Sequence, residues 1–303
     1  MSDPSSQKSL VLIWAGRVLM TVSIVFIAVR FWEYRRSVGD QLANPELLAS
    51  IIIFCAIYAM SGLLLALGWW LILCCRSDWG KGLQWKMATL IYGKTQIAKY
   101  IPGNIFHFAG RHVLARNAGA SHAQLVAAAT GEILMTLAAA GLISLLAVRS
   151  FLERVSGNWI WLGVLAAGIA MALGVFAFRR LGLMRILQGA QPVRLLLAQY
   201  SYLLFFAVSA SLFLLVIMLV ADKNPEWQLV AGCYAAAWAI GFVVPGAPGG
   251  FGVRETMLVA FLSGVLEEKT ILLAAILFRL VTTCGDFLFF LGASILSRRI
   301  DPS

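Results

Sequence analysis

Two stretches of the chain place an arginine shortly after a proline–glycine break in apolar sequence. The first, "IPGNIFHFAGR" (101–111), ends at Arg111, and the second, "VPGAPGGFGVRE" (244–255), ends at Arg254 and Glu255. In both, the arginine follows the proline of the Pro-Gly pair by nine positions. A backbone that is not helical at membrane depth must be buried in protein or face water. An arginine beside such a break presents a planar set of donors suited to phosphate.

The second break combines glycines with charges. Gly249, Gly250 and Gly252 permit tight turns and a close approach of the backbone to a ligand. A helix that resumes near Gly252 directs its first N–H groups and the positive end of its dipole into the same space. Arg254 then lies in the first turn, and Glu255 would pair with a base or bind a cationic head group. We expect these five residues to bind substrate; the alternative is a tight cytoplasmic turn between two thin spans, with Arg254 reaching the membrane surface.

Three further charges lie inside apolar runs. Glu132 lies in one predicted span, and Arg279 and Asp286 lie in the last. Arg279, Thr282, Thr283 and Asp286 are spaced i, i+3, i+4 and i+7, which places them on one helix face. Intramembrane charges face an interior cavity or pair with one another. We expect Arg279 to bind substrate, and Glu132 and Asp286 to supply cavity charge or to carry protons. The alternative is a purely structural pair, either Glu132 with Arg279 or Asp286 with an arginine.

Composition indicates an integral membrane protein. Of 303 residues, 61% are hydrophobic and 13% are charged, against roughly 25% charged residues in soluble domains. The net charge of +10 is typical of basic cytoplasmic loops beside anionic lipid, so we expect no nucleic-acid partner. The five cysteines form no CxxC pattern and the three histidines have no ligand cluster beside them, so we expect no metal, cofactor or disulfide framework.

The predicted fold is an all-α, polytopic membrane domain over residues 1–303. Residues 84–117 carry too many bases for a lipid-facing span, because each central Lys or Arg costs ~2.5–3.5 kcal/mol. That segment is predicted to be a re-entrant hairpin or, alternatively, a basic amphipathic helix on the inner leaflet. Residues 228–244 and 251–265 are short apolar pieces on either side of the second break. Six segments are long and apolar enough to be full spans: 10–30, 47–73, 122–147, 158–178, 199–220 and 270–296.

Loop charges predict the orientation. Basic loops after the second and fourth spans, together with the basic C-terminal end, place both termini in the cytoplasm. The N-terminal residues lack the basic region and cleavage site of a signal peptide, so the first apolar run is expected to be retained. Three spans per half is an odd number, so the halves 10–148 and 158–297 are predicted to be inverted repeats. Broken segments at matching places in such halves indicate a transporter's binding site.

These motifs resemble those of the lysylphosphatidylglycerol synthase transmembrane region family. The resemblance rests on "KYIPGNIFHFAGR" (99–111) and "PGAPGGFGVRE" (245–255), followed by a span with an arginine such as Arg279, and it covers about residues 10–297. The family includes the lipid-flippase domain of the bacterial multiple peptide resistance factor and standalone relatives. It implies re-entrant elements and a head-group cavity lined by Arg111, Arg254, Glu255 and Arg279. Bifunctional members continue into a soluble aminoacyl-transferase domain, whereas this chain stops at Ser303, so no transfer chemistry is expected.

The predicted function is a lipid translocase of the bacterial inner membrane. Its substrate would be an anionic or phosphate-containing membrane lipid, with no catalytic residue involved. One alternative is an accessory protein that scaffolds or regulates an envelope-synthesis enzyme without transporting lipid. Besides lipid, the expected partners are a second copy of the chain or an envelope-synthesis enzyme. A less favoured alternative is a membrane enzyme acting on a lipid-linked substrate, for which His107 and His112 are the only candidate bases and have no acid beside them.

Overall fold

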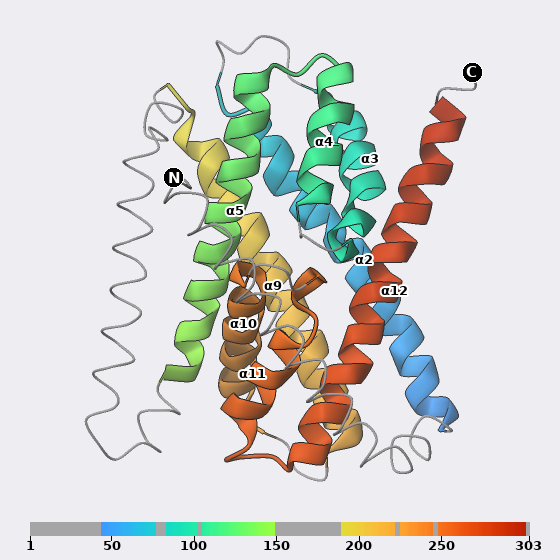
Figure 1. Ribbon diagram of the computed structural model, residues 1–303, viewed down its shortest axis with the longest axis vertical. Coiled ribbons are helices and arrows are strands. Elements are labelled where there is room, and N and C mark those ends of the chain that lie inside the picture. Colours follow the sequence, from blue (N-terminus) through green and yellow to red (C-terminus); the bar gives the residue numbers. More distant parts are fainter. Residues whose placement is uncertain are drawn as a thin grey trace, which may run out of the picture.

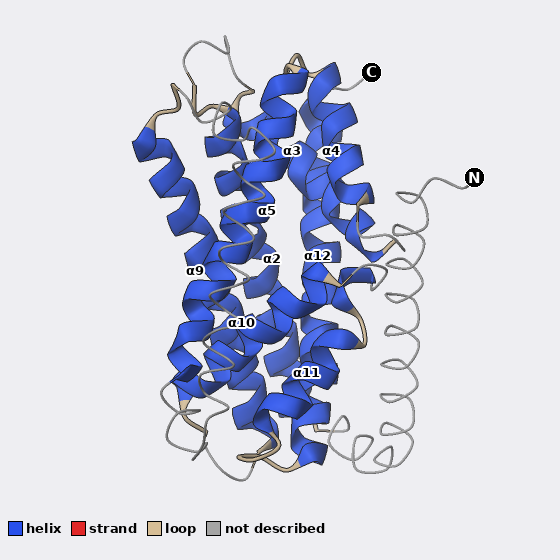
Figure 2. Cartoon of the chain, turned by 60° about the vertical axis from the view of Figure 1, so that its left-hand side comes forward, coloured by secondary structure: helices blue, strands red, loops and turns tan. Residues whose placement is uncertain are grey.

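The computed structural model describes residues 44–76, 83–101, 105–148, 189–221, 225–244 and 248–300. Within these ranges the structure consists of eight α-helices and short 3-10 turns, with no strand (Figure 2). The predicted all-α class is therefore confirmed for this part of the chain. The predicted spans 10–30 and 158–178 lie outside the described residues.

Four helices in the described ranges are long and apolar enough to cross a membrane. They correspond to the predicted spans 47–73, 122–147, 199–220 and 270–296. Local sequence signals fix where two of them begin: the Asn44 side chain caps the first, and Ser121 and Gln124 form a capping box at the second. The four helices are α2 (Pro45–Leu73), α5 (His122–Ser144, continued by the 3-10 turn η3, Leu145–Ala147), α9 (Pro192–Val220) and α12 (Glu268–Ile300).

The remaining helices form two hairpins. The first contains α3 (Trp85–Gln96), η2 (Ile97–Tyr100) and α4 (Phe106–Asn117), and the second contains α10 (Trp227–Val243), η4 (Pro248–Gly250) and α11 (Val253–Leu262). At 1.5 Å per residue, α3, α4 and α11 are only ~15–18 Å long, about half the thickness of a bilayer's hydrocarbon core.

The hairpins occupy opposite halves of the bundle and meet near its middle. In Figure 1, α3 and α4 lie along the upper half and α10 and α11 along the lower half, while α2, α5, α9 and α12 run the full length. The tips η2 and η4 contact each other. Both hairpins run along the bundle axis.

Each hairpin packs against a long helix from the other half of the chain. Helix α12 packs on α3, and α5 packs on α10. Small residues allow this closeness: a Cβ added at Gly93 would lie 2.6 Å from the Cβ of Ala293, and one at Gly232 would lie 2.5 Å from Ala147.

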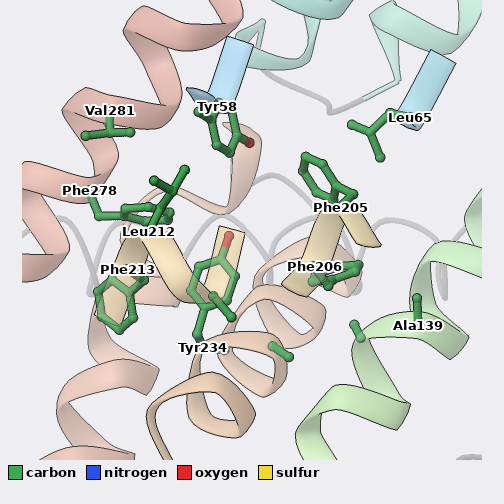
Figure 3. Packing of buried hydrophobic residues seen from close by; sticks show 14 of the residues in the cluster. Tyr58, Leu65, Ala139, Phe205, Phe206, Leu212, Phe213, Tyr234, Phe278 and Val281 are labelled. Atoms are coloured by element: carbon green, nitrogen blue, oxygen red, sulfur yellow. The ribbon is translucent and has the colours of Figure 1, made fainter. Parts of the chain in front are cut away.

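An aromatic core lies beneath the hairpin tips. Figure 3 shows Tyr58, Phe205, Phe213, Tyr234 and Phe278 converging from α2, α9, α10 and α12. Their ring centroids lie 5.3–6.4 Å apart, within the usual range for paired aromatic rings. Rings of this core line both cavities of the candidate site described below.

Charges are segregated along the bundle axis. The upper end in Figure 1 carries bases, the lower end carries mostly acids, and the remaining described charges lie near the hairpin tips. The charges at the upper end are Arg76, Lys86, Arg116, Arg194 and Arg298, and those at the lower end are Glu46, Glu226, Glu267, Glu268 and Lys269. Lys94 lies in the last turn of α3, towards the hairpin tip.

Candidate functional site

Arg111 forms a buried ion pair, although its Nε has no hydrogen-bond partner among the described residues. It lies on α4 with 2% of its surface exposed, and its Nη1 donates to Glu132 Oε2 at 2.5 Å. The Tyr92 hydroxyl donates to the other carboxylate oxygen at 2.7 Å, and the guanidinium lies 3.7 Å from the centre of the Tyr92 ring. The predicted alternative pairing of Glu132 with Arg279 is therefore wrong, because the first hairpin places Arg111 against Glu132.

Asp286 fastens the first hairpin tip to α12. Lys99 Nζ lies 2.6 Å from Asp286 Oδ2, and the Tyr100 hydroxyl donates to the same oxygen at 2.6 Å. The alternative pairing of Asp286 with an arginine is also wrong, because the partner is a lysine. Lys99 and Tyr100 lie just before the Pro-Gly break at Pro102. This position beside the break was the signal for their role at the site, and the sequence analysis missed it.

Glu255 caps the helix in which it lies. Helix α11 begins at Val253, as predicted, and Glu255 Oε2 accepts a hydrogen bond from the Gly252 N–H at 2.8 Å. Its Oε1 lies 3.1 Å from Arg279 Nε. Glu255 therefore pairs with a base, the first of its two predicted roles, and it also satisfies one N–H at the start of α11.

Arg279 holds the second hairpin tip. Its Nη1 donates to the Gly249 carbonyl at 3.0 Å, and its guanidinium lies 5.1 Å from the centre of the Phe251 ring. The Nε–H is close to Glu255 but is not directed at it, so that contact is an ion pair without a hydrogen bond. Nη2 is buried and has no hydrogen-bond partner in the described residues.

The glycines of the second break provide conformation and space. Gly249, Gly250 and Gly252 have φ of +56°, +73° and +85°, a region that L side chains adopt only with strain. A Cβ on Gly250 would lie 2.6 Å from Arg254 Nε, and one on Gly241 would lie 2.6 Å from Arg254 Cγ. These glycines therefore allow the Arg254 stem to lie against the backbone.

Unlike Lys99, Arg111 and Arg279, Arg254 has no carboxylate partner among the described residues. Its Nε is buried and unbonded, and its guanidinium lies 5.1 Å from the centre of the Trp238 ring. The nearest acid along the chain, Glu255, is engaged with Gly252 and Arg279.

Two cavities adjoin at Arg254. The larger spans about 580 Å³, a volume that includes space open to the surroundings. Both hairpins line it, with Lys99, Arg111 and Gly249 among the lining residues. The smaller, about 330 Å³, is lined by Glu255, Arg279 and Thr282, among others. Arg254 and Trp238 line both cavities. Trp238 was not predicted, because a tryptophan in an apolar run carries no signal of a site.

The structure therefore gathers all the predicted charged site residues around the hairpin tips. Among the described residues, four cations line the two cavities, and three carboxylates line them or pair with these cations, leaving one positive charge in excess. The cations are Lys99, Arg111, Arg254 and Arg279, and the carboxylates are Glu132, Glu255 and Asp286.

The described ranges contain no group of three or more potential metal-ligating His, Cys, Asp or Glu residues. Comparison with protein-family models gives no match, and comparison with curated proteins gives none either.

Proposed function

We propose that this protein moves a lipid with an anionic, phosphate-containing head group between the leaflets of a membrane. The observation that carries the proposal is Arg254, a guanidinium without a carboxylate partner among the described residues, placed where the two cavities adjoin. Arg254 is half-buried with a buried Nε, and an uncompensated charge in such a place is costly, so retaining one indicates a ligand of opposite charge. A phosphodiester would neutralise the excess charge, and its oxygens would accept hydrogen bonds from the N–H groups that Arg254 leaves unused.

The arrangement of the hairpins supports transport rather than simple binding. One hairpin enters from each end of the bundle, and both contribute to the larger cavity. Each half then reads long helix, hairpin, long helix: α2, α3–α4 and α5, followed by α9, α10–α11 and α12. We interpret the halves as inverted repeats that expose the cavity alternately to the two leaflets, as in transporters built this way.

The proposed location is the bacterial inner membrane, with the basic end of the bundle in the cytoplasm. The resemblance of the sequence motifs to those of the lysylphosphatidylglycerol synthase transmembrane region family also supports this proposal. The orientation is tested by single cysteines at exposed end positions in a cysteine-free background. A membrane-impermeant maleimide should label a cysteine at Glu226 in intact cells and leave one at Arg116 unlabelled; the reverse pattern would overturn the orientation.

The head-group site is tested by the lipids that remain bound to the purified protein. We expect mass spectrometry to find one anionic lipid class enriched over the membrane average in the wild type. Arg254→Ala should lose that enrichment. Arg298→Ala removes an exposed cation from the basic end of α12, so it should retain the lipid. Bulk lipid in all three samples would contradict the site and favour an accessory role.

Transport itself needs a separate assay. Reconstituted vesicles carrying a fluorescent phosphatidylglycerol in both leaflets are treated with an impermeant quencher. Wild-type protein should make the inner-leaflet label accessible, and Arg254→Ala should not. Lipid enrichment without any such exchange would establish binding and exclude translocation of that lipid.

A further inference from the structure

Two histidines meet at the outer end of the first hairpin, away from the cavities at its tip. His112 Nε2 lies 2.9 Å from His122 Nδ1, and the ring centroids are 5.1 Å apart with a tilt of 32° between the planes. His112 lies in α4 and His122 begins α5. His112 is half-buried and His122 is exposed, so the pair is accessible from water.

The connection between the two helices holds the rings in place. The Arg116 side chain donates to the Ala120 carbonyl at 3.0 Å, Gly119 turns the chain at a φ of +97°, and Ser121 and Gln124 close a capping box at the start of α5. The turn between the two helices is therefore short and internally bonded, so little further ordering is needed to keep the two histidines together.

In the structure the 2.9 Å contact is a hydrogen bond from the N–H of one ring to the lone pair of the other. The same spacing of the nitrogens also fits a transition-metal ion. With metal–nitrogen bonds of ~2.0–2.1 Å, two ligands lie ~2.9 Å apart at a right angle and ~3.3 Å apart at a tetrahedral angle. The observed 2.9 Å matches neighbouring positions in square-planar or octahedral geometry. A tetrahedral ion requires the rings to separate by only a few tenths of an ångström.

The chemistry of the pair fits as well. A neutral imidazole has one N–H and one lone pair, so both rings can present lone pairs to a metal while their outward nitrogens carry the protons. Imidazole suits Ni²⁺, Cu²⁺ and Zn²⁺, whereas Mg²⁺ and Ca²⁺ prefer oxygen. With two protein ligands, water would complete the coordination, so the ion would be exchangeable.

We propose that His112 and His122 form a binding site for a divalent transition-metal ion that links α4 to α5. This site is independent of the proposed lipid function. Its position gives it a consequence for the hairpin, because Arg111, the residue before His112, is buried against Glu132 of α5. A bound ion would add a second link between the same two helices, from the residue after Arg111 on α4 to the first residue of α5.

Binding is tested by titrating Ni²⁺, and separately Zn²⁺, into purified protein that carries no histidine tag, with isothermal calorimetry as the readout. We expect one saturable site. His112→Asn and His122→Asn should each lower the metal affinity by ~10–100-fold or more, because losing even a group that only supports a metal ligand has an effect of that size. His107→Gln is the matched control, because His107 is the only other histidine of the chain and lines the tip cavity; it should bind the metal as the wild type does.

Size-exclusion profiles and thermal unfolding without metal verify that each variant is folded. In the wild type, the ion should raise the unfolding temperature, and in both asparagine variants it should not. Equal affinity of the wild type and the two asparagine variants, or no saturable binding by folded wild type, would overturn the proposal.

Discussion

Arg111 donates to Glu132 across a buried 2.5 Å contact, whereas Arg254, at the matching distance after its own Pro-Gly break, has no such partner among the described residues. The difference arises from the helix that follows each hairpin. In the first half that helix, α5, offers Glu132, and in the second half α12 offers Arg279. Two guanidinium groups cannot form an ion pair, so Arg279 contacts Glu255 and Gly249, and Arg254 is left without a carboxylate partner among the described residues.

Removing Glu132 should destabilise the protein strongly. Glu132→Ala leaves the Arg111 charge buried without compensation, and breaking a buried pair from one side costs ~3–5 kcal/mol. We expect a large fall in the unfolding temperature in detergent. The double variant Glu132→Leu with Arg111→Met should recover most of it, since neither charge then remains. A double variant less stable than Glu132→Ala would contradict this account.

Arg254 and Arg279 should separate binding from stability. Arg254→Ala removes a cation with no ionic partner among the described residues, so thermal stability should be unchanged or higher while bound lipid is lost. Arg279→Ala removes the bond to the Gly249 carbonyl and the ion pair with Glu255, so it should lower the unfolding temperature. Equal loss of stability in the two variants would show that Arg254 has a structural role.

The Asp286 carboxylate should control the mobility of the first hairpin tip. Asp286→Asn preserves the shape but removes the charge that holds Lys99, and it weakens the bond from Tyr100. Hydrogen exchange should become faster in a peptide covering residues 97–101 and should remain unchanged in peptides from α9. Ser297→Ala, farther along α12, serves as the control. Unchanged exchange at 97–101 in Asp286→Asn would show that other contacts fix the tip.

Two glycines with positive φ distinguish strain from loss of space. Gly119→Ala and Gly250→Ala each place a side chain in the left-handed region, at ~1–2 kcal/mol. A Cβ at Gly119 meets nothing within 4 Å, whereas one at Gly250 meets Arg254 Nε at 2.6 Å. Both variants should lose some stability, but only Gly250→Ala should also lose the bound lipid. Retention of lipid by Gly250→Ala would mean that Arg254 can bind from a displaced position.

The sequence by itself determined the features that depend on local composition. Apolar runs predicted four of the helices, because a segment's hydrophobicity and length are properties of that segment alone. The start of α11 near Gly252 followed from the glycine and proline positions, since backbone preferences act within a few residues. The intramembrane charges of Glu132, Arg279 and Asp286 identified the region of the candidate site, because polar groups are costly in lipid wherever the helix packs.

Only the tertiary structure decided which charge meets which. The sequence allowed Glu132 to pair with Arg279, but the hairpin brings Arg111 to it instead, and Asp286 takes Lys99 from a segment far away along the chain. Ion pairs depend on distances of a few ångströms between side chains, and these are fixed by how helices pack, not by residue type or spacing. The same packing placed Trp238 beside Arg254 and thereby turned an ordinary apolar residue into part of the candidate site.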